Sequence, residues 1–292
     1  MRKYRLDGVG LAVLLGVTLL LAFNQIIIKL VNQGLQPVFF AGARSALAIV
    51  FVGGWLWYRG LTGRVKWADL GPGLAIGTIF AIEFLGLFVA LDLTTVGRAA
   101  LIMNSMPVWI GVLAHFFLPG ERATPVKAAG LALVFAGTAW AILSKNASGQ
   151  PSMLGDFCAL IGAWGWAGTA FLARKTRLRV AGPEAQLFWM VLVSAPLLLI
   201  AAPFFGPLIR DVHWTDWFWL VFQAAAVVAG GFITWLWLFS VYPAATVASF
   251  SGLTPILAIL LSHFIFAEHV SPSLIGAAVL VSGGIMLVNR RA

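Results

Sequence analysis

Two ionisable residues, Arg44 and Glu83, stand inside stretches of sequence that are otherwise long and apolar. A charge deep in apolar surroundings is costly, so it indicates either a functional group or a buried partner. Each residue lies about seven or eight positions from the end of its stretch, which in a helix corresponds to a depth of roughly 10–12 Å. Equal depth suggests a salt bridge between them, acting as a gate or as a static lock. Alternatively, Glu83 exchanges protons, or Arg44 holds a substrate carboxylate.

Neutral polar groups and aromatic rings form a second set of side chains that could bind a small solute. Most of the thirteen tryptophans stand at the ends of apolar stretches, where indole rings favour a membrane interface. Trp109, Trp164 and Trp166 instead stand near the middle of such stretches, and several neutral polar residues also lie within them. Together they give the candidate binding residues Asn24, Gln25, Thr78, Asn104, Trp109, Trp164, Trp166, Gln223 and Ser251. Aromatic walls with a few polar points suit a small amphipathic solute, such as an aromatic or apolar amino acid. The alternative for each residue is helix packing.

Other chemistries lack the residues that they need. His115 and His263 are expected near opposite faces of a membrane, and no cysteine or carboxylate cluster accompanies them at metal-ligand spacing. The single cysteine, Cys158, permits no intrachain disulfide. The sequence shows neither a nucleophile paired with a base nor a glycine-rich phosphate loop. We therefore expect no enzymatic activity, no metal and no cofactor.

The composition places most of the chain in lipid. Hydrophobic residues make up 61% of the sequence and charged residues 10%, with a mean hydropathy of +0.97. A soluble domain could not bury so much apolar surface. Ten stretches reach the roughly 20 residues that a membrane-spanning helix needs, and they lack the two-residue alternation of a membrane barrel. We predict an all-α integral membrane protein with helices near residues 8–30, 38–58, 70–91, 97–118, 125–144, 154–173, 184–203, 216–239, 245–267 and 272–289.

The basic residues that give the chain its net charge of +9 fall mainly in connections on one side of the predicted membrane. If the N-terminus is cytoplasmic, the cytoplasmic segments hold fourteen Lys and Arg residues and the opposite connections hold four. Such a bias is the positive-inside rule, so both termini are expected in the cytoplasm. The basic surplus therefore does not indicate a nucleic-acid partner.

One motif occurs twice in the chain. MPVWIGVLAHFFLPGERATP covers residues 106–125, and TPILAILLSHFIFAEHVSP covers residues 254–272. The copies fall in the fourth and ninth predicted helices, which are five positions apart in the helix order. Because successive helices alternate in direction, the two copies cross the membrane in opposite directions. We predict two inverted five-helix repeats, residues 1–147 and 148–292. This arrangement is characteristic of secondary transporters that work by alternating access; the alternative is a duplication retained for packing.

The repeated prolines, Pro107 and Pro255, are predicted in the middle of their helices. A proline there removes a backbone hydrogen bond and bends the helix. The two kinks are either paired gating points beside a central cavity or fixed bends.

The end of each copy carries a helix-start signal. Thr124 and Ser271 each precede a proline, which is the pattern of an N-cap followed by the first helical residue. Glu121 and Glu268 stand just before them, at the predicted membrane surface, where we expect them to be solvated or paired locally.

These two stretches resemble the drug/metabolite transporter superfamily, in its ten-helix branch with two EamA-type repeats. The glycines after each copy and the stretch SVYPAATVASFSGLTPI at residues 240–256 add to the resemblance. Within the superfamily the chain is most similar to bacterial aromatic amino-acid exporters. The resemblance implies export of small amphipathic metabolites, foremost aromatic and neutral amino acids, across a bacterial inner membrane.

Two other functions stay open on the sequence. One is export of other metabolites or drugs, including sugar-phosphate-like solutes. Phosphate recognition would need several basic residues in the cavity, and Arg44 is the one clearly placed inside a span. The other is a membrane scaffold that transports nothing. The sequence leaves open whether protons drive transport and how many copies assemble.

Overall fold

The computed structural model describes residues 7–118, 124–144, 152–242, 247 and 250–289. Regular structure in these residues is helical, apart from one isolated bridge between Leu35 and Ile209. Eight helical segments there are long and apolar enough to cross a membrane, and 251–266 and 272–288 are shorter apolar helices. The prediction of an all-helical membrane protein is confirmed. The predicted boundary between the repeats, at residues 147 and 148, lies outside the described residues and stays a prediction.

The helices follow the order expected from the sequence. The first half contains α1 (Gly8–Gly34), α2 (Pro37–Tyr58), η1 (Thr62–Arg64), η2 (Trp67–Asp69), α3 (Leu70–Leu93), α4 (Val96–Met103), α5 (Met106–Phe117) and α6 (Pro125–Leu143). The second half contains α7 (Met153–Lys175), α8 (Leu178–Ala181), α9 (Pro183–Ala201), η3 (Ala202–Phe205), α10 (Trp214–Phe222), η4 (Gln223–Gly231), α11 (Phe232–Val241), η5 (Ser251–Leu253), α13 (Thr254–Phe266) and α14 (Pro272–Val288). The fourth, eighth and ninth predicted spans are each divided into shorter helical pieces.

The two predicted helix starts have the expected caps. The hydroxyl of Thr124 accepts a hydrogen bond from the N–H of Lys127 at 3.3 Å, at the start of α6. The hydroxyl of Ser271 accepts one from Leu274 at 3.2 Å, at the start of α14. Each cap uses an N–H group that a helix start leaves without an intrahelical acceptor.

The repeated prolines begin helices rather than kink them, which corrects the expectation from the sequence. Pro107 is the second residue of α5, and Pro255 is the second residue of α13. A proline fits the first turn because the N–H groups there have no intrahelical partner. The fourth span is therefore broken between α4 and α5, and the ninth span changes from η5 to α13 just before its proline.

Polar side chains bind the backbone at both breaks. In the fourth span, Nδ2 of Asn104 donates to the carbonyl oxygen of Ala100 at 2.8 Å. In the ninth, the hydroxyl of Ser282 on α14 donates to the carbonyl oxygen of Gly252 at 2.6 Å. Backbone groups without partners are costly inside a bilayer, so these hydrogen bonds stabilise the broken helices.

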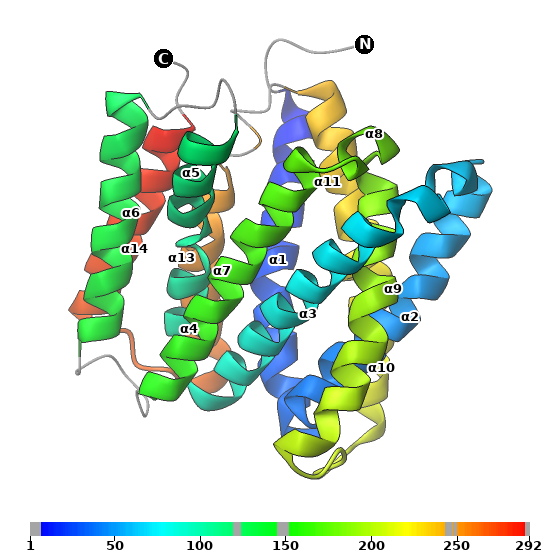
Figure 1. Cartoon of the computed structure of the whole chain (residues 1–292). Coiled ribbons are helices and arrows are strands. Elements are labelled where there is room, and N and C mark those ends of the chain that lie inside the picture. The colour runs from blue at the N-terminus through cyan, green and yellow to red at the C-terminus, as the bar shows by residue number, and fades with distance from the viewer. Residues whose placement is uncertain (1–6, 119–123, 145–151, 243–246, 248–249, 290–292) are drawn as a thin grey trace.

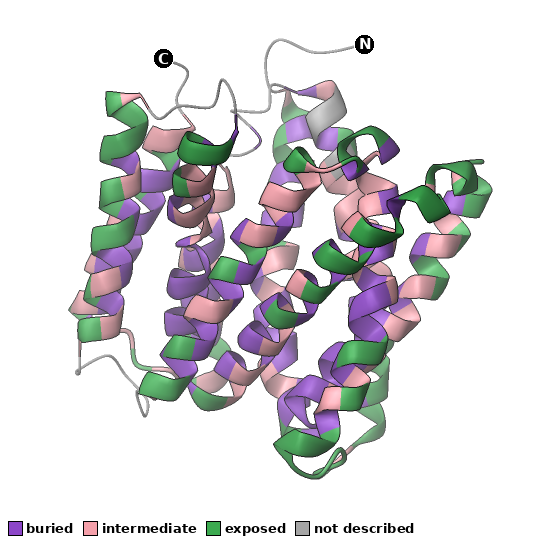
Figure 2. Cartoon of the chain, viewed as in Figure 1, coloured by how far each residue is buried: buried purple, intermediate pink, exposed green. Residues whose placement is uncertain are grey.

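Four helix pairs join the two halves through extensive contacts: α3 with α7, α6 with α14, α2 with α9, and α3 with α9. Figure 1 shows α6 and α14 side by side at one edge of the bundle, with α3 and α7 crossing its middle. The outer side of α6 carries many exposed residues (Figure 2), as expected of a surface that faces lipid. Helix α1 begins and α14 ends on the same face of the bundle (Figure 1). We call the opposite face, where α1, α3 and α13 end, the distal face.

Candidate functional site

Three residues from three helices meet inside the bundle: Asn24 of α1, through its backbone, and the side chains of Arg44 of α2 and Gln223 of η4. Gln223 connects the other two, because its Oε1 accepts from Nη1 of Arg44 at 3.2 Å and its Nε2 donates to the carbonyl oxygen of Asn24 at 3.1 Å. At about 1.5 Å per residue, all three lie roughly 10–15 Å from the distal ends of their helical segments. We call these three residues the polar cluster.

The helix that supplies Gln223 is unusual. Residues Gln223–Gly231 form a π-helix between the α-helical pieces α10 and α11. π-helical turns are rare and occur frequently at functional sites. The apolar sequence predicts one continuous helix here, because the hydrogen-bond register of a helix leaves no clear mark in such a sequence.

Arg44 is buried against aromatic rings. Its guanidinium carbon lies 3.9 Å from the ring centre of Phe84 and 4.9 Å from that of Phe88, both on α3. Such contacts attract a cation to the face of the ring. The side chain is 2% exposed, and its buried Nε and Nη2 atoms have no hydrogen-bond partner among the described residues.

Glu83 and Arg44 do not form the salt bridge that their equal depth suggested. Oε2 of Glu83 accepts a hydrogen bond from the hydroxyl of Thr169 on α7 at 3.2 Å, and no ion pair joins Glu83 to Arg44 in the described part of the chain. Because α3 extends to Leu93, Glu83 lies roughly 15 Å from the distal end of its helix and is deeper than Arg44. Gly165 of α7 packs against the backbone of Glu83, which brings the carboxylate toward α7.

Trp109 of α5 and Trp164 of α7 form an aromatic pair. Their ring centres are 5.5 Å apart and their planes are inclined by 87°, an edge-to-face arrangement. The indole N–H of Trp109 donates to the hydroxyl of Ser105 at 3.0 Å, so the ring is tied to the break between α4 and α5. Trp164 is 43% exposed, which leaves ring surface available for a further contact.

The other candidate binding residues are Trp166, Thr78, Ser251 and Gln25. Trp166 is two residues from Trp164 and therefore lies roughly 200° around the helix, away from the aromatic pair. Thr78 is exposed, and Ser251 begins η5. Gln25 is buried, and its Oε1 lacks a partner among the described atoms. Their part in binding stays a prediction.

A network at the distal face links the two halves, and the sequence analysis did not find it. Nζ of Lys29 lies 3.2 Å from Oε1 of Glu268 and donates to the carbonyl oxygen of Thr94 at 2.7 Å. The same Glu268 oxygen accepts from the backbone N–H of Val96 at 3.1 Å. Glu268 therefore pairs with a residue far away in the chain, although a solvated or local partner was expected; Glu121 lies outside the described residues.

Two further basic residues of the distal half are also paired. Arg98 of α4 binds the carboxylate of Asp156 of α7 through Nε, at 3.1 Å, and through Nη2, and both side chains are buried. Arg210 binds Asp92 at 2.8 Å, and these hydrogen bonds raise the pKa of Arg210. Three of the four basic residues that opposed the positive-inside bias, Lys29, Arg98 and Arg210, thus have acidic partners, and the fourth, Lys145, lies outside the described residues.

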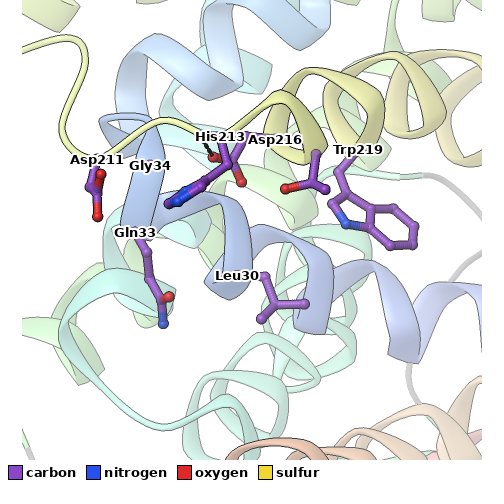
Figure 3. A pocket seen from close by; sticks show the side chains of 8 residues that line it. Leu30, Gln33, Gly34, Asp211, His213, Asp216 and Trp219 are labelled. Atoms are coloured by element: carbon purple, nitrogen blue, oxygen red, sulfur yellow. Dashed lines mark hydrogen bonds between the residues drawn. The ribbon is translucent and has the colours of Figure 1, made fainter.

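A pocket of about 240 Å³ opens at the distal face, between the end of α1 and the start of α10 (Figure 3). Its lining residues are Leu30, Gln33, Gly34, Asp211, His213, Thr215, Asp216 and Trp219. Oδ2 of Asp216 accepts from the backbone N–H of His213 at 2.8 Å, so this carboxylate caps α10. The pocket shares no lining residue with the polar cluster.

The helical architecture, with polar groups buried deep in the bundle, defines a multi-pass membrane protein of the transporter class. The chain belongs to the EamA-like transporter family, which it matches over residues 8–143 and 153–290. It is 29% identical over 267 residues to the uncharacterized transporter YvbV of Bacillus subtilis (strain 168), covering 88% of this chain and 83% of that protein. A crystal structure with 20% sequence identity superposes with a TM-score of 0.67 over 96% of both chains, which shows the fold alone. The protein is therefore a membrane transporter of small molecules.

Proposed function

We propose that this transporter exports small amphipathic metabolites, and aromatic and neutral amino acids in particular, through a central cavity between its two repeats. The observation that carries the proposal is the aromatic pair of Trp109 and Trp164, which lies beside a broken span and joins one helix of each repeat. A flat ring can stack against such a pair, and aromatic contacts of this kind contribute about 0.5–1.5 kcal/mol each.

Alternating access is supported by the position of the distal network. The ion pair of Lys29 and Glu268 joins α1 of the first repeat to the end of α13 in the second. A transporter of two inverted repeats opens by rocking one repeat against the other, so contacts across the repeats must break on the side that opens. The observed pairing corresponds to a closed distal side.

The orientation in the membrane follows from the charge distribution. We place both termini in the cytoplasm of a bacterium and the distal face outside the inner membrane, because fourteen of the Lys and Arg residues fall in segments on the side of the termini. Glu83 is the group that would couple export to protons, since it is a buried acid whose hydrogen-bond donor is the neutral hydroxyl of Thr169.

The test is exchange of labelled solutes in liposomes that contain the purified protein. The panel holds tryptophan, phenylalanine, methionine, threonine, glutamate and a sugar phosphate, each with and without a pH gradient. We expect saturable exchange of the aromatic and neutral amino acids, reduced roughly tenfold in Trp164→Ala because an aromatic contact is lost. Trp214→Ala, at an exposed helix start, is the control and retains exchange.

The remaining arms separate the parts of the proposal. Glu83→Gln retains exchange but loses any stimulation by the pH gradient if Glu83 couples transport to protons. Exchange of the sugar phosphate alone would contradict the substrate class while leaving the family assignment intact. Equal exchange by Trp164→Ala and Trp214→Ala would remove the aromatic pair from the binding site.

A further inference from the structure

The polar cluster contains a buried cation that forms no direct ion pair within the described part of the chain. Arg44 is 2% exposed, and its hydrogen bond to Gln223 uses Nη1 alone. Its Nε and Nη2 atoms are buried and, in the part of the chain that the structure describes, unpartnered. Guanidinium remains charged in proteins, and a charge inside a membrane span is costly unless it is paired. The cluster therefore has the chemistry of half of an ion pair.

The two unpartnered atoms share one edge of the guanidinium group. The N–H bonds on the Nε–Nη2 edge are parallel, and this edge matches the two oxygens of a carboxylate. The same chain shows the complete arrangement at Arg98, where Nε and Nη2 bind the two carboxylate oxygens of Asp156. The edge that Arg98 uses for a carboxylate is thus the edge that Arg44 leaves unpartnered.

The guanidinium of Arg44 is held in position by its neighbours. Phe84 and Phe88 lie against it, with ring centres 3.9 Å and 4.9 Å away, and Gln223 accepts from Nη1. A group whose orientation is set before binding loses little conformational freedom when a ligand arrives. The unpartnered edge is therefore preorganised.

A buried acceptor belongs to Asn24, whose backbone Gln223 binds. Oδ1 of Asn24 is buried and unpartnered, whereas the backbone carbonyl of the same residue accepts from Nε2 of Gln223. An amide oxygen of this kind needs a donor, and an ammonium group offers three donors and no acceptor. Through Gln223, an edge that needs a carboxylate and an oxygen that needs a donor are held in one cluster.

We infer that the polar cluster binds the head group of a zwitterionic α-amino acid, with its carboxylate on Nε and Nη2 of Arg44 and its ammonium group on Oδ1 of Asn24. The inference rests on the proposed function and adds the site that recognises what all α-amino acids share. It makes Arg44 and Asn24 the residues that discriminate amino acids from amines and from simple carboxylic acids.

The experiment measures exchange of labelled L-phenylalanine by the full chain in liposomes, with two analogues as competitors. Phenethylamine lacks the carboxylate, and 3-phenylpropionate lacks the ammonium group. On the wild type, we expect the inhibition constant of each analogue to exceed that of unlabelled L-phenylalanine by a factor of about ten, because each analogue loses one charged contact. In Arg44→Gln the KM for L-phenylalanine rises at least roughly tenfold, and the disadvantage of phenethylamine disappears.

Further variants define the second contact and the control. In Asn24→Ala the disadvantage of 3-phenylpropionate relative to L-phenylalanine becomes smaller. Arg44→Lys transports better than Arg44→Gln but less well than the wild type, because lysine cannot bind a carboxylate through two parallel N–H groups. Arg59→Gln makes the same change at the end of the same helix, where Arg59 lies over the ring of Trp55, and leaves the KM unchanged.

The results distinguish failure of the proposed function from failure of the inference about the polar cluster. If the wild type exchanges no α-amino acid, the proposed function and the inference both fall. If it exchanges L-phenylalanine and Arg44→Gln retains the same KM, only the inference falls. If Arg44→Gln does not fold, the competition experiment on the wild type still tests the inference. The inference is overturned if phenethylamine competes as well as L-phenylalanine.

Discussion

Arg44 and Arg98 show how the same side chain has different consequences at two buried positions. Arg98 is bound through two nitrogens to Asp156, and its remaining donors reach backbone carbonyl oxygens at Ser144 and Ile142. Arg44 has one hydrogen bond, to Gln223. Breaking a buried ion pair leaves a partner charge uncompensated, whereas no carboxylate is in direct contact with Arg44 in the described part of the chain.

The two arginines should therefore respond differently to the same substitution. Arg98→Gln leaves the carboxylate of Asp156 unpaired, and we expect the free energy of unfolding to fall by about 3–5 kcal/mol. Arg44→Gln removes a buried charge that makes no direct ion pair, and it should leave the stability unchanged or raise it. The measurement is the midpoint of thermal unfolding of each variant in the same detergent. Equal losses in both variants would contradict this account of Arg44.

At the scale of helices, close approach at glycine decides the contact between α6 and α14. A Cβ added at Gly284 would lie 2.6 Å from the carbonyl oxygen of Gly130, and a Cβ at Gly130 would lie 2.9 Å from the carbonyl oxygen of Gly284. The two backbones thus touch, as they do at small residues in membrane helix pairs. Gly283, one position earlier, has no atom within 4 Å of an added Cβ.

Neighbouring glycines on α14 therefore provide a matched pair of substitutions. Gly284→Ala forces the two helices apart, and we expect overpacking to cost about 1–3 kcal/mol of stability. Gly283→Ala adds a methyl group in open space and removes a flexible residue from a helix, so stability should not fall. Thermal unfolding of both variants in detergent measures the difference. A similar loss at both positions would show that the α6–α14 contact is not set by backbone approach.

At the scale of the whole molecule, ion pairs lie at both faces of the bundle. Lys29 and Glu268 join the two halves at the distal face, and Arg64 and Glu184 are 3.6 Å apart on the side of the termini. A protein with two conformations shifts toward the one whose contacts are left intact. Removing an ion pair from one face should therefore favour the conformation that is open at that face.

The distal ion pair gives a direct test of alternating access. In a Cys158→Ala background with Asn24→Cys as a reporter, Glu268→Gln should increase labelling from the distal side by an impermeant thiol reagent. A contribution of about 1 kcal/mol from a partly buried pair corresponds to a roughly fivefold increase. Glu184→Gln, on the opposite face, is the control and should not increase distal labelling. Equal labelling in the two variants would mean that the Lys29–Glu268 contact does not close the distal side.

The predicted spans and helix starts came from local features of the sequence. The caps at Thr124 and Ser271 were predicted because a hydroxyl before a proline acts on N–H groups a few residues away. Pro107 and Pro255 were predicted as kinks in the middle of continuous helices, whereas each begins a helix, because the missing N–H of proline is compatible with both arrangements. The candidate binding residues were selected by type and depth, and these properties did not indicate which of them share a site.

The sequence alone was sufficient for an all-helical membrane protein with repeated halves. Inside a bilayer each span must form its own backbone hydrogen bonds and be apolar over a known length. Both requirements depend on residues that are close together in the sequence. The partners of the charged residues could be identified only from the tertiary structure. Depth along a helix is visible in sequence, but the direction of a side chain around the helix axis and the tilt of the helix depend on packing against distant segments. For that reason Arg44 lies beside Gln223 rather than forming a salt bridge with Glu83, and Glu268 pairs with Lys29.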